Sequence, residues 1–271
     1  MEIFGYVSSI FMGLSLGMIG GGGSILTVPI LVYLFSISPE VATAYSLFIV
    51  GSTAFVGGIF YYKKGDVDLK TGFVFALPSF IGVYLTRAYV MPAIKSPIIS
   101  YGDFILTKPV LIMFVFALLM LAASFSMIKT PKNIDLSNEI KSQAVSTKKF
   151  FLIALEGLIV GGVTGFVGAG GGFLIIPALV ILVGMPMKKA VGTSLFIIAS
   201  KSLIGFIGDL QQQTIIHWNL IILITMIAVL GLILGTFISK NISEKNLKRG
   251  FGYFVLIMGS GILLDQLRRL H

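Results

Sequence analysis

The chain has 271 residues, of which 56% are hydrophobic and only 11% charged, and its formal net charge is +9. A soluble domain carries about 25% charged residues, so this chain has too few to cover a water-facing surface. The composition therefore predicts an integral membrane protein. The absence of cysteine excludes disulfides and thiolate metal sites, and His217 and His271 belong to no metal-ligand pattern in the sequence.

The excess of Lys and Arg is compatible with a nucleic-acid or acidic-lipid partner. Membrane proteins also concentrate these residues in cytoplasmic loops, which explains the charge more simply. We therefore expect a lipid bilayer as partner and no nucleic acid. We expect no cleaved signal peptide, because the first apolar stretch runs directly into a glycine-rich element. A membrane enzyme is disfavoured by the lack of a Cys or His cluster and of a carboxylate pair inside an apolar segment, and we expect no cofactor.

Apolar segments occur in two groups of five. A spanning helix needs about 20 apolar residues. The first group is 3–19, 25–36, 41–62, 71–91 and 109–128, and the second group is 150–167, 173–184, 190–208, 218–239 and 249–265. The second segment of each group is too short to span comfortably and directly follows glycines. We expect it to be the returning arm of a hairpin or half of a broken helix.

The two groups are related by an internal duplication. They align without gaps at an offset of 148 residues, and 16 of 42 positions are identical between 17–58 and 165–206. We therefore predict an all-α polytopic membrane protein with a first repeat at 1–128, a polar linker at 129–149 and a second repeat at 150–271. Each repeat contains a glycine-broken or re-entrant helical hairpin plus three spanning helices, which gives eight to ten membrane segments.

The loop charges predict that the repeats are inverted. If each repeat crosses the membrane an odd number of times, the turns at 63–70, 184–189 and 240–249 lie on the same side as the linker. That side then holds 14 Lys and Arg, against five on the opposite side. Four crossings per repeat would divide these charges almost evenly. The positive-inside rule therefore favours inverted repeats with a cytoplasmic linker and both termini outside.

A glycine-rich element occurs at the same place in each repeat. One copy runs from Gly17 to Ser24, and the other from Gly165 to Gly172. Backbone breaks at membrane depth are tolerated only where they are buried in protein or line a wet cavity. Glycines let a ligand approach the main chain, and the start of the following helix suits an anion. The predicted substrate-binding positions are Gly20, Gly21, Gly22, Gly23, Ser24, Gly168, Gly170, Gly171 and Gly172.

Close helix packing is the alternative explanation for these glycines. It fits the small residues spaced four apart, which form a packing stripe in each repeat. We assign that stripe to packing: Ser9, Gly13, Gly17, Gly157, Gly161 and Gly165. A nucleotide-binding phosphate loop is a poor alternative, because neither element is followed by Gly-Lys-Ser or Gly-Lys-Thr.

Lys201 lies in the middle of an apolar segment, where an ionised side chain is costly unless it faces a cavity or a partner. Its repeat counterpart is Thr53, and the preceding residues are Ser200 and Ser52. A cation with hydroxyl groups nearby suits an oxyanion. The alternative is a lysine that snorkels or pairs with Glu156 or Asp209.

Further hydroxyl groups open the third segment of each repeat. They either cap a helix or complete the anion site with the glycines. The predicted site therefore also includes Ser46, Ser52, Thr193, Ser194, Ser200 and Lys201. Arg87 lies near the end of its segment and is expected to snorkel, Trp218 is expected to anchor the membrane interface, and a coupling role for Glu156 stays open.

These motifs resemble the TauE/SafE family of sulfite and sulfonate exporters. The second repeat fits best, with Gly165 to Pro177 followed by Ala190-Val-Gly-Thr-Ser-Leu195. The first repeat departs from the pattern at Ala44-Tyr45-Ser46. The resemblance covers nearly the whole chain and implies a multi-pass cell-membrane permease for small anions, often sulfur-containing.

The expected function is secondary transport of a small anion such as sulfite or an organosulfonate, most simply as an exporter. The anion would bind between the two glycine turns near the membrane midplane, and alternating access would come from rocking one repeat against the other. The alternative is a passive anion channel on the same scaffold. The coupling proton or ion and the oligomeric state stay open.

Overall fold

A computed structural model describes residues 2–101, 104–128, 147–181, 183–211, 216–238 and 244–269. The chain opens with α1 (Glu2–Ile19), a 3₁₀ helix η1 (Gly21–Leu26), one turn α2 (Thr27–Pro29) and a π-helical turn η2 (Ile30–Leu34). Next come α3 (Pro39–Lys63) and α4 (Leu69–Leu85), which continues through the π-helical turn η3 (Thr86–Val90) into α5 (Met91–Ala93). A short antiparallel hairpin of β1 (Ile99–Tyr101) and β2 (Phe104–Leu106) precedes α6 (Lys108–Ile128).

The second half contains α7 (Thr147–Val167), α8 (Gly172–Ile181), α9 (Met187–Leu210), α10 (Trp218–Ile238) and α11 (Glu244–Arg268). Most of the predicted linker, 129–149, lies outside the described residues, and its last three residues belong to α7. The division of the chain into two repeats at this linker stays a prediction.

Six helices in the described part of the chain are long and apolar enough to cross a membrane. They are α3, α4 with its continuation to Ala93, α6, α9, α10 and the Arg249–Arg268 part of α11, which gives three in each half. The segments on either side of the first glycines, Ile3–Ile19 and Gly21–Leu34, are apolar but shorter. The predicted all-α polytopic membrane fold is confirmed, and the β1–β2 hairpin is an addition that the sequence did not predict.

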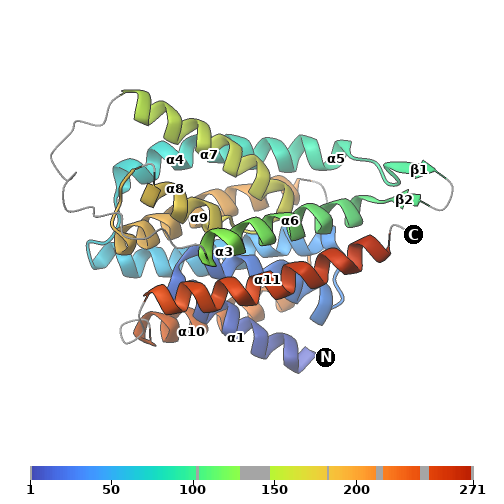
Figure 1. Cartoon of the computed structure of the whole chain (residues 1–271), viewed down its shortest axis with the longest axis horizontal. Helices are drawn as coiled ribbons and strands as arrows, with labels where there is room; N and C mark the ends of the chain where they lie inside the picture. Colours follow the sequence, from blue (N-terminus) through green and yellow to red (C-terminus); the bar gives the residue numbers. More distant parts are fainter. Residues whose placement is uncertain are drawn as a thin grey trace.

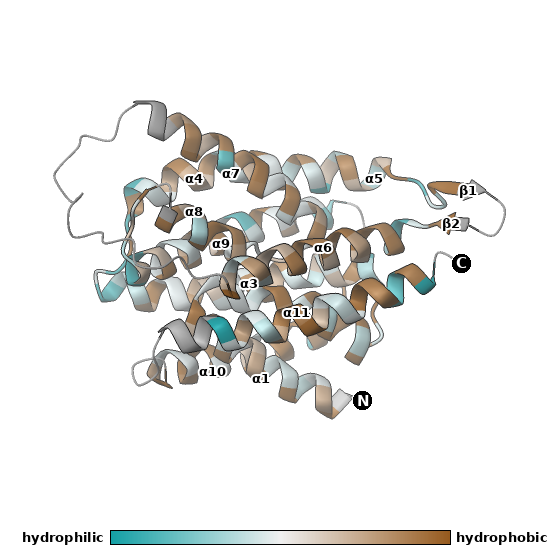
Figure 2. Ribbon diagram, viewed as in Figure 1, coloured by the Kyte–Doolittle hydropathy of each residue, from teal (hydrophilic) through white to brown (hydrophobic). Residues whose placement is uncertain are grey.

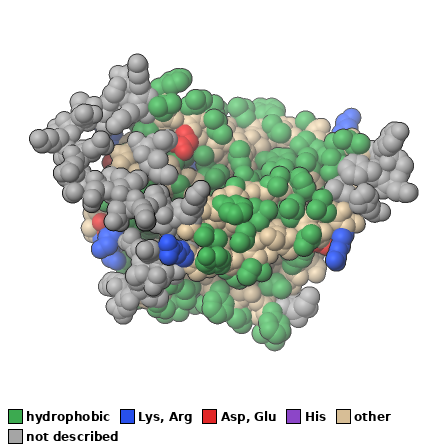
Figure 3. All heavy atoms as spheres, in the orientation of Figure 1, with side chains coloured by type: hydrophobic (Ala, Val, Ile, Leu, Met, Phe, Trp, Pro, Cys, Tyr) green, Lys and Arg blue, Asp and Glu red, His purple; other side chains and the backbone are tan. Residues whose placement is uncertain are grey.

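The helices run along the long axis of the molecule (Figure 1). Both termini and the β1–β2 hairpin lie at one end, and the turn between α3 and α4 lies at the other end. Hydrophobic residues cover the middle of the helices, and hydrophilic residues gather toward the two ends (Figure 2). The space-filling view shows the same division on one face, with Lys and Arg at the two ends of an apolar belt (Figure 3). A bilayer would therefore surround the middle of the helices.

The predicted packing glycines lie where helices approach most closely. A Cβ atom on Gly13 or Gly17 of α1 would overlap the backbone of α10, and a Cβ atom on Gly161 of α7 would overlap the backbone of α4 at Ser79. A Cβ atom on Gly165 would lie 3.0 Å from the Val83 Cα of α4, which is closer than an ordinary van der Waals contact. The packing role assigned to these glycines is confirmed.

The helices α3 and α9 form the centre of the molecule. In the membrane-spanning part of α3, 67% of the residues are buried, and in that of α9, 72% are buried. The other four spans have 28% to 44% of their residues buried. The two helices pack against each other, α9 also packs against α8, and the first glycine break contacts α8 and α9. The two glycine breaks are therefore surrounded by protein, as irregular backbone at membrane depth requires.

Candidate functional site

The two glycine breaks meet at the centre of the molecule. A Cβ atom on Gly21 would overlap the Cα of Gly172, and a Cβ atom on Gly172 would overlap the Cα of Gly21. Every residue of Gly20–Ser24 and of Gly168–Gly172 is buried. The space between the breaks is closed in this structure, so a ligand can enter it only if the backbones at Gly21 and Gly172 move apart.

The two breaks differ in conformation, although the sequence predicts similar turns. In the second break, 168–171 is non-helical, and Gly168, Gly170 and Gly171 have φ angles of 72°, 62° and 75°. In the first break only Gly20 has a positive φ, and a 3₁₀ helix begins at the next residue. Glycines without side chains permit this tighter winding. The second break therefore interrupts helical structure over more residues than the first.

Lys201 lies beside the second break. Its side chain is 1% exposed, and its Nζ donates a hydrogen bond to the Thr164 hydroxyl. A Cβ atom on Gly171 would lie 2.9 Å from the Lys201 Nζ. Among the described residues, no carboxylate forms an ion pair with Lys201. The lysine therefore neither snorkels nor pairs with Glu156 or Asp209, and its charge is directed at the glycine backbone.

One face of α3 covers the second break. Gly168 packs on Thr43, and Gly170 packs on Val50, with a Cβ on Gly170 lying 2.6 Å from the Val50 Cγ1. Ser46 lies between these residues on the same helical face. It is fully buried, and its hydroxyl has no hydrogen-bond partner among the described residues. This hydroxyl group is thus an uncommitted polar group close to the break.

The equivalent face of α9 covers the first break. Gly20 packs on Val191, and a Cβ on Gly21 would lie 2.6 Å from the Ile198 Cδ1. Ser194 lies between them, fully buried, with its hydroxyl donating to the Val191 carbonyl at 2.8 Å. The same helical face continues to Lys201.

Ser24 links the two breaks. Its hydroxyl donates to the Gly21 carbonyl at 2.6 Å, and a Cβ on Gly170 would lie 3.3 Å from the same hydroxyl oxygen. The remaining glycines of the first break face α1 rather than the second break, since Gly22 packs near Ile19 and Gly23 against Ser15. Of the first cluster, Gly20, Gly21 and Ser24 lie at the contact between the halves.

Three predicted site residues are not brought to the glycine breaks. The Thr193 hydroxyl accepts a hydrogen bond from the Asp68 backbone N–H at 2.9 Å, so it holds the turn before α4. The Ser200 hydroxyl donates to the Phe196 carbonyl, and the residue lines a pocket of about 390 Å³ with outward-facing apolar residues. Ser52 is half-buried. Thr193 and Ser200 are each one residue, about 100° of helical rotation, away from Ser194 and Lys201, which face the breaks.

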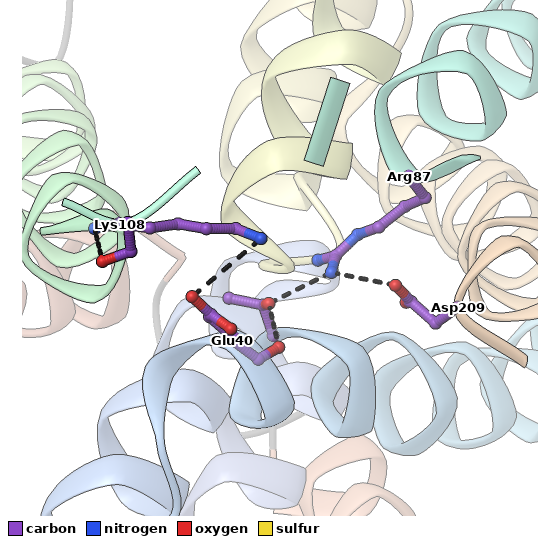
Figure 4. Close-up of polar contacts among 6 residues, drawn as sticks. Glu40, Arg87, Lys108 and Asp209 are labelled. Atoms are coloured by element: carbon purple, nitrogen blue, oxygen red, sulfur yellow. Dashed lines mark hydrogen bonds and ion pairs between the residues drawn. The ribbon is translucent and has the colours of Figure 1, made fainter. Parts of the chain in front are cut away.

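A buried ion pair lies near the second break. The Arg87 Nη1 donates to the Asp209 Oδ1 at 3.3 Å and to the Thr43 hydroxyl at 3.1 Å. Arg87 is 1% exposed, so the prediction that it snorkels is wrong. The π-helical turn η3 extends α4 past Leu85 and carries Arg87 toward the end of α9. Lys108 and Arg87 approach the start of α3 from opposite sides (Figure 4).

The sequence offers one signal for this pair, because Arg87 and Asp209 are opposite charges near the ends of apolar segments. It does not show that they meet, and it also allows Arg87 to snorkel and Asp209 to pair with Lys201. Thr43 and Thr164 were also missed, because single hydroxyls in apolar helices usually bond their own backbone. Their proximity depends on contacts between residues 37 to 122 positions apart.

One cavity lies away from the buried lysine, which is not among the residues that line it. It has a volume of about 900 Å³ and lies between α1, the segment after the first break and α11. Its lining is almost entirely apolar, with Phe11, Met18, Leu26 and Phe254 among the contributors. Such a surface suits apolar chains, whereas an anion requires the polar groups around Lys201.

Comparison with known proteins identifies the family. Residues 6–262 match the family described as Sulfite exporter TauE/SafE. A "Probable membrane transporter protein" of Xylella fastidiosa is 29% identical over 248 residues, covering 90% of this chain and 88% of that protein. The "Probable membrane transporter protein YunE" of Bacillus subtilis is 25% identical over 279 residues, covering 96% and 98%.

An archaeal relative has similar coverage. A probable membrane transporter protein of Methanocaldococcus jannaschii is 26% identical over 272 residues and covers 94% of both chains. No solved structure matches the chain. These relatives are named as transporters rather than enzymes, and together with the family match they show a multi-pass membrane transporter. The chain belongs to the sulfite exporter TauE/SafE family.

Proposed function

We propose that this transporter exports a small anion, most simply sulfite or an organosulfonate, and binds it at the second glycine break beside Lys201. The observation that carries the proposal is the buried lysine without a carboxylate partner among the described residues. The Thr164 hydroxyl and Gly171 lie beside the Lys201 Nζ, and α8 begins at the next residue, Gly172. The free N–H groups at the start of a helix attract anions.

The charge balance of the buried residues supports an anionic substrate. Among the described residues, the buried charged side chains are Arg87, Asp209 and Lys201. Arg87 and Asp209 compensate each other, so Lys201 contributes one positive charge in excess. An uncompensated charge in a dry interior is costly. A monovalent oxyanion bound at Lys201 would remove this cost, and the family's description favours a sulfur oxyanion.

We also propose that the two halves are inverted repeats that rock against each other. At the 148-residue offset, α1 corresponds to α7, α3 to α9, α4 to α10 and α6 to α11. The contact of α1 with α10 therefore corresponds to that of α7 with α4, and the contact of α3 with α10 to that of α9 with α4. The α3–α9 and α6–α11 contacts are their own counterparts. Such a relation supports alternating access at the shared centre.

The closed contact between the glycine breaks favours a transporter over a passive channel. Gly21 and Gly172 are packed backbone to backbone, so no continuous path passes between them in this conformation. An anion can pass only when one half moves relative to the other. We propose the cell membrane as the location, with the linker on the cytoplasmic side, from the loop charges.

A binding assay tests the proposed site. The thermal unfolding temperature of purified protein is measured with sulfite, methanesulfonate, sulfate and acetate in turn. We expect stabilisation by sulfite or methanesulfonate, and at least tenfold weaker apparent affinity in Lys201→Met, because a charge-assisted hydrogen bond contributes about 1.5–3 kcal/mol. Ser200→Ala is the matched control, since Ser200 faces away from the breaks. Unchanged affinity in Lys201→Met would remove the lysine from the site.

A further inference from the structure

We propose that Asp209 is a proton-binding site, and that the transported anion and a proton bind together because the anion replaces Asp209 on Arg87. The inference rests on the proposed function, which it extends by naming the coupling ion and the residues that bind it. Arg87 comes from the first half and Asp209 from the second, so the ion pair joins the two halves that must move.

The position of the pair connects it to the second break. The Arg87 guanidinium also bonds the Thr43 hydroxyl, and the backbone of Thr43 packs on Gly168. A Cβ atom on Gly168 would lie 2.5 Å from the Thr43 carbonyl oxygen, so the contact has no intervening space. The second break therefore has a buried cation on each side, with Lys201 at Gly171 and Arg87 beyond Thr43.

Among the described residues, no buried cation lies at the corresponding positions of the first break. The counterpart of Lys201 at the 148-residue offset is Thr53, which is buried and bonds the Ile49 carbonyl. The counterpart of Arg87 is Gly235, which packs on the Leu14 backbone. The two breaks thus occupy corresponding positions in the two halves but differ in the charges beside them. An anion that leaves Lys201 through the second break reaches Arg87 as the next buried cation.

The chemistry of the pair determines what happens when an anion arrives. Arginine stays protonated in proteins, so its charge always requires a counter-ion at this depth. A sulfonate or sulfite group presents oxygens that match the guanidinium fork, as the carboxylate of Asp209 does. Once released from Arg87, a carboxylate in a buried environment favours its neutral form. One proton then forms an O–H bond on Asp209 and leaves again when the anion departs, while Arg87 keeps all its protons.

The other charged groups near Asp209 do not replace its role. Lys108 of α6 acts on Asp209 through its charge, and its Nζ lies 3.9 Å from the Glu40 Oε1 of α3. The Glu40 side chain is 41% exposed, so water can compensate its charge without proton uptake. Asp209 has 8% exposure and contacts Arg87 directly. It is therefore the carboxylate whose charge depends on whether Arg87 is occupied.

The exchange predicts that anion and proton travel in the same direction. One proton binds Asp209 when a monovalent anion takes its place on Arg87, so the anion and the proton cross together and the transport step is electrically neutral. Export is then driven by anion accumulated inside the cell and slowed by an acidic exterior. The protein would act as an anion–proton cotransporter operating outward.

The first experiment needs no substrate. Infrared spectroscopy of Arg87→Gln detects whether Asp209 takes up a proton when its partner is removed. We expect the carbonyl band of a protonated carboxylic acid in Arg87→Gln and no such band in the Arg87→Gln, Asp209→Asn double variant. Asp265→Asn in the Arg87→Gln background is the matched control, because Asp265 pairs with Arg269 on the exposed end of α11 and should leave the band in place. Absence of the band in Arg87→Gln would overturn the proposal.

The second experiment measures coupling in proteoliposomes. Methanesulfonate is the probe, because its charge does not change with pH, and an enclosed pH dye reports protons. We expect wild-type protein to move about one proton with each methanesulfonate. In Asp209→Asn we expect proton movement to stop, and the change of anion flux with pH to become at least tenfold smaller. Proton movement that persists in Asp209→Asn would overturn the inference. Wild-type protein that moves no methanesulfonate would count against the proposed substrate, and the infrared result would still decide the role of Asp209.

Discussion

Gly171 shows how a single residue combines backbone conformation with the site. Its φ of 75° lies in the left-handed region, which disfavours side chains. A Cβ there would overlap the Thr164 methyl group and lie 2.9 Å from the Lys201 Nζ. Both constraints concern the residues that we place around the anion, so this glycine is required by the geometry of the site as well as by the turn.

We expect Gly171→Ala to destabilise the protein by about 2–5 kcal/mol, from about 1–2 kcal/mol of backbone strain and about 1–3 kcal/mol of overpacking. Thermal unfolding followed by the fluorescence of Trp218, the single tryptophan, measures the change. Gly22→Ala is the control, because Gly22 lies in the 3₁₀ helix. The nearest atom that its added Cβ would meet is the Ile19 Cγ2, at 3.0 Å. Equal stability of the two variants would contradict the different conformations of the two breaks.

Two helix pairs, α1 with α10 and α7 with α4, pack closely in the two halves of the chain. Both depend on glycines, which let backbones approach where no hydrophobic force from water drives the helices together. Gly231 and Gly235 of α10 complete the first contact by packing on the α1 backbone at Ile10 and Leu14. Each half thus attaches its glycine-containing first helix to a spanning helix through the same type of surface.

Enlarging a glycine in either contact should therefore separate the helices. We expect Gly17→Ala and Gly161→Ala each to lower stability by about 1–3 kcal/mol, because the added methyl groups would overlap the Leu232 and Ser79 backbones. Gly261→Ala should be neutral or slightly stabilising, since no atom lies within 4 Å of its position and alanine favours a helix. Thermal unfolding in the same detergent compares the three variants, and tolerance of alanine at both contacts would exclude this packing role.

Apolar length and glycine placement allowed most helices to be predicted from the sequence. The spans come from runs of about 20 apolar residues, and the short segments after the glycines from runs that end too early. The mixed 3₁₀, α and π winding of Gly21–Leu34 could not be predicted, because it depends on contacts with Gly172 and α1. The β1–β2 hairpin was missed because its strands have only three residues each.

The site was predicted less completely than the fold. Lys201 stood out because a charge within an apolar run has few explanations. Thr193, a hydroxyl residue at a helix start, and Ser200, the neighbour of Lys201, bond Asp68 and Phe196 instead of facing the breaks. The ion pair of Arg87 could not be predicted, because its partner, Asp209, is 122 residues away and no periodicity within one segment indicates such a contact.

At the scale of the whole molecule, the ends of the helices give an orientation that can be tested. The turn that follows Lys63 lies at the opposite end from the hairpin and both termini (Figure 1). The charges of the loops predict that the end containing this turn is cytoplasmic. The chain has no cysteine, so single cysteines introduced at either end report sidedness without background.

We expect a membrane-impermeant maleimide to label Lys95→Cys in intact cells and Lys63→Cys only after the membrane is permeabilised. Both positions are exposed at the ends of spanning segments. Labelling of an untreated sample of each variant in detergent controls for reactivity. The reverse labelling pattern would place the linker outside the cell and contradict the proposed orientation of the protein in the membrane.

The central claim is that a saturable site at the second glycine break, with Lys201 as its cation, carries an anion across the membrane. Counterflow of sulfite in proteoliposomes tests this most directly. We predict saturable uptake of labelled sulfite that is accelerated by unlabelled sulfite inside, and a loss of at least tenfold in Lys201→Met. Flux that rises linearly with concentration, or that is unchanged in Lys201→Met, would contradict the account.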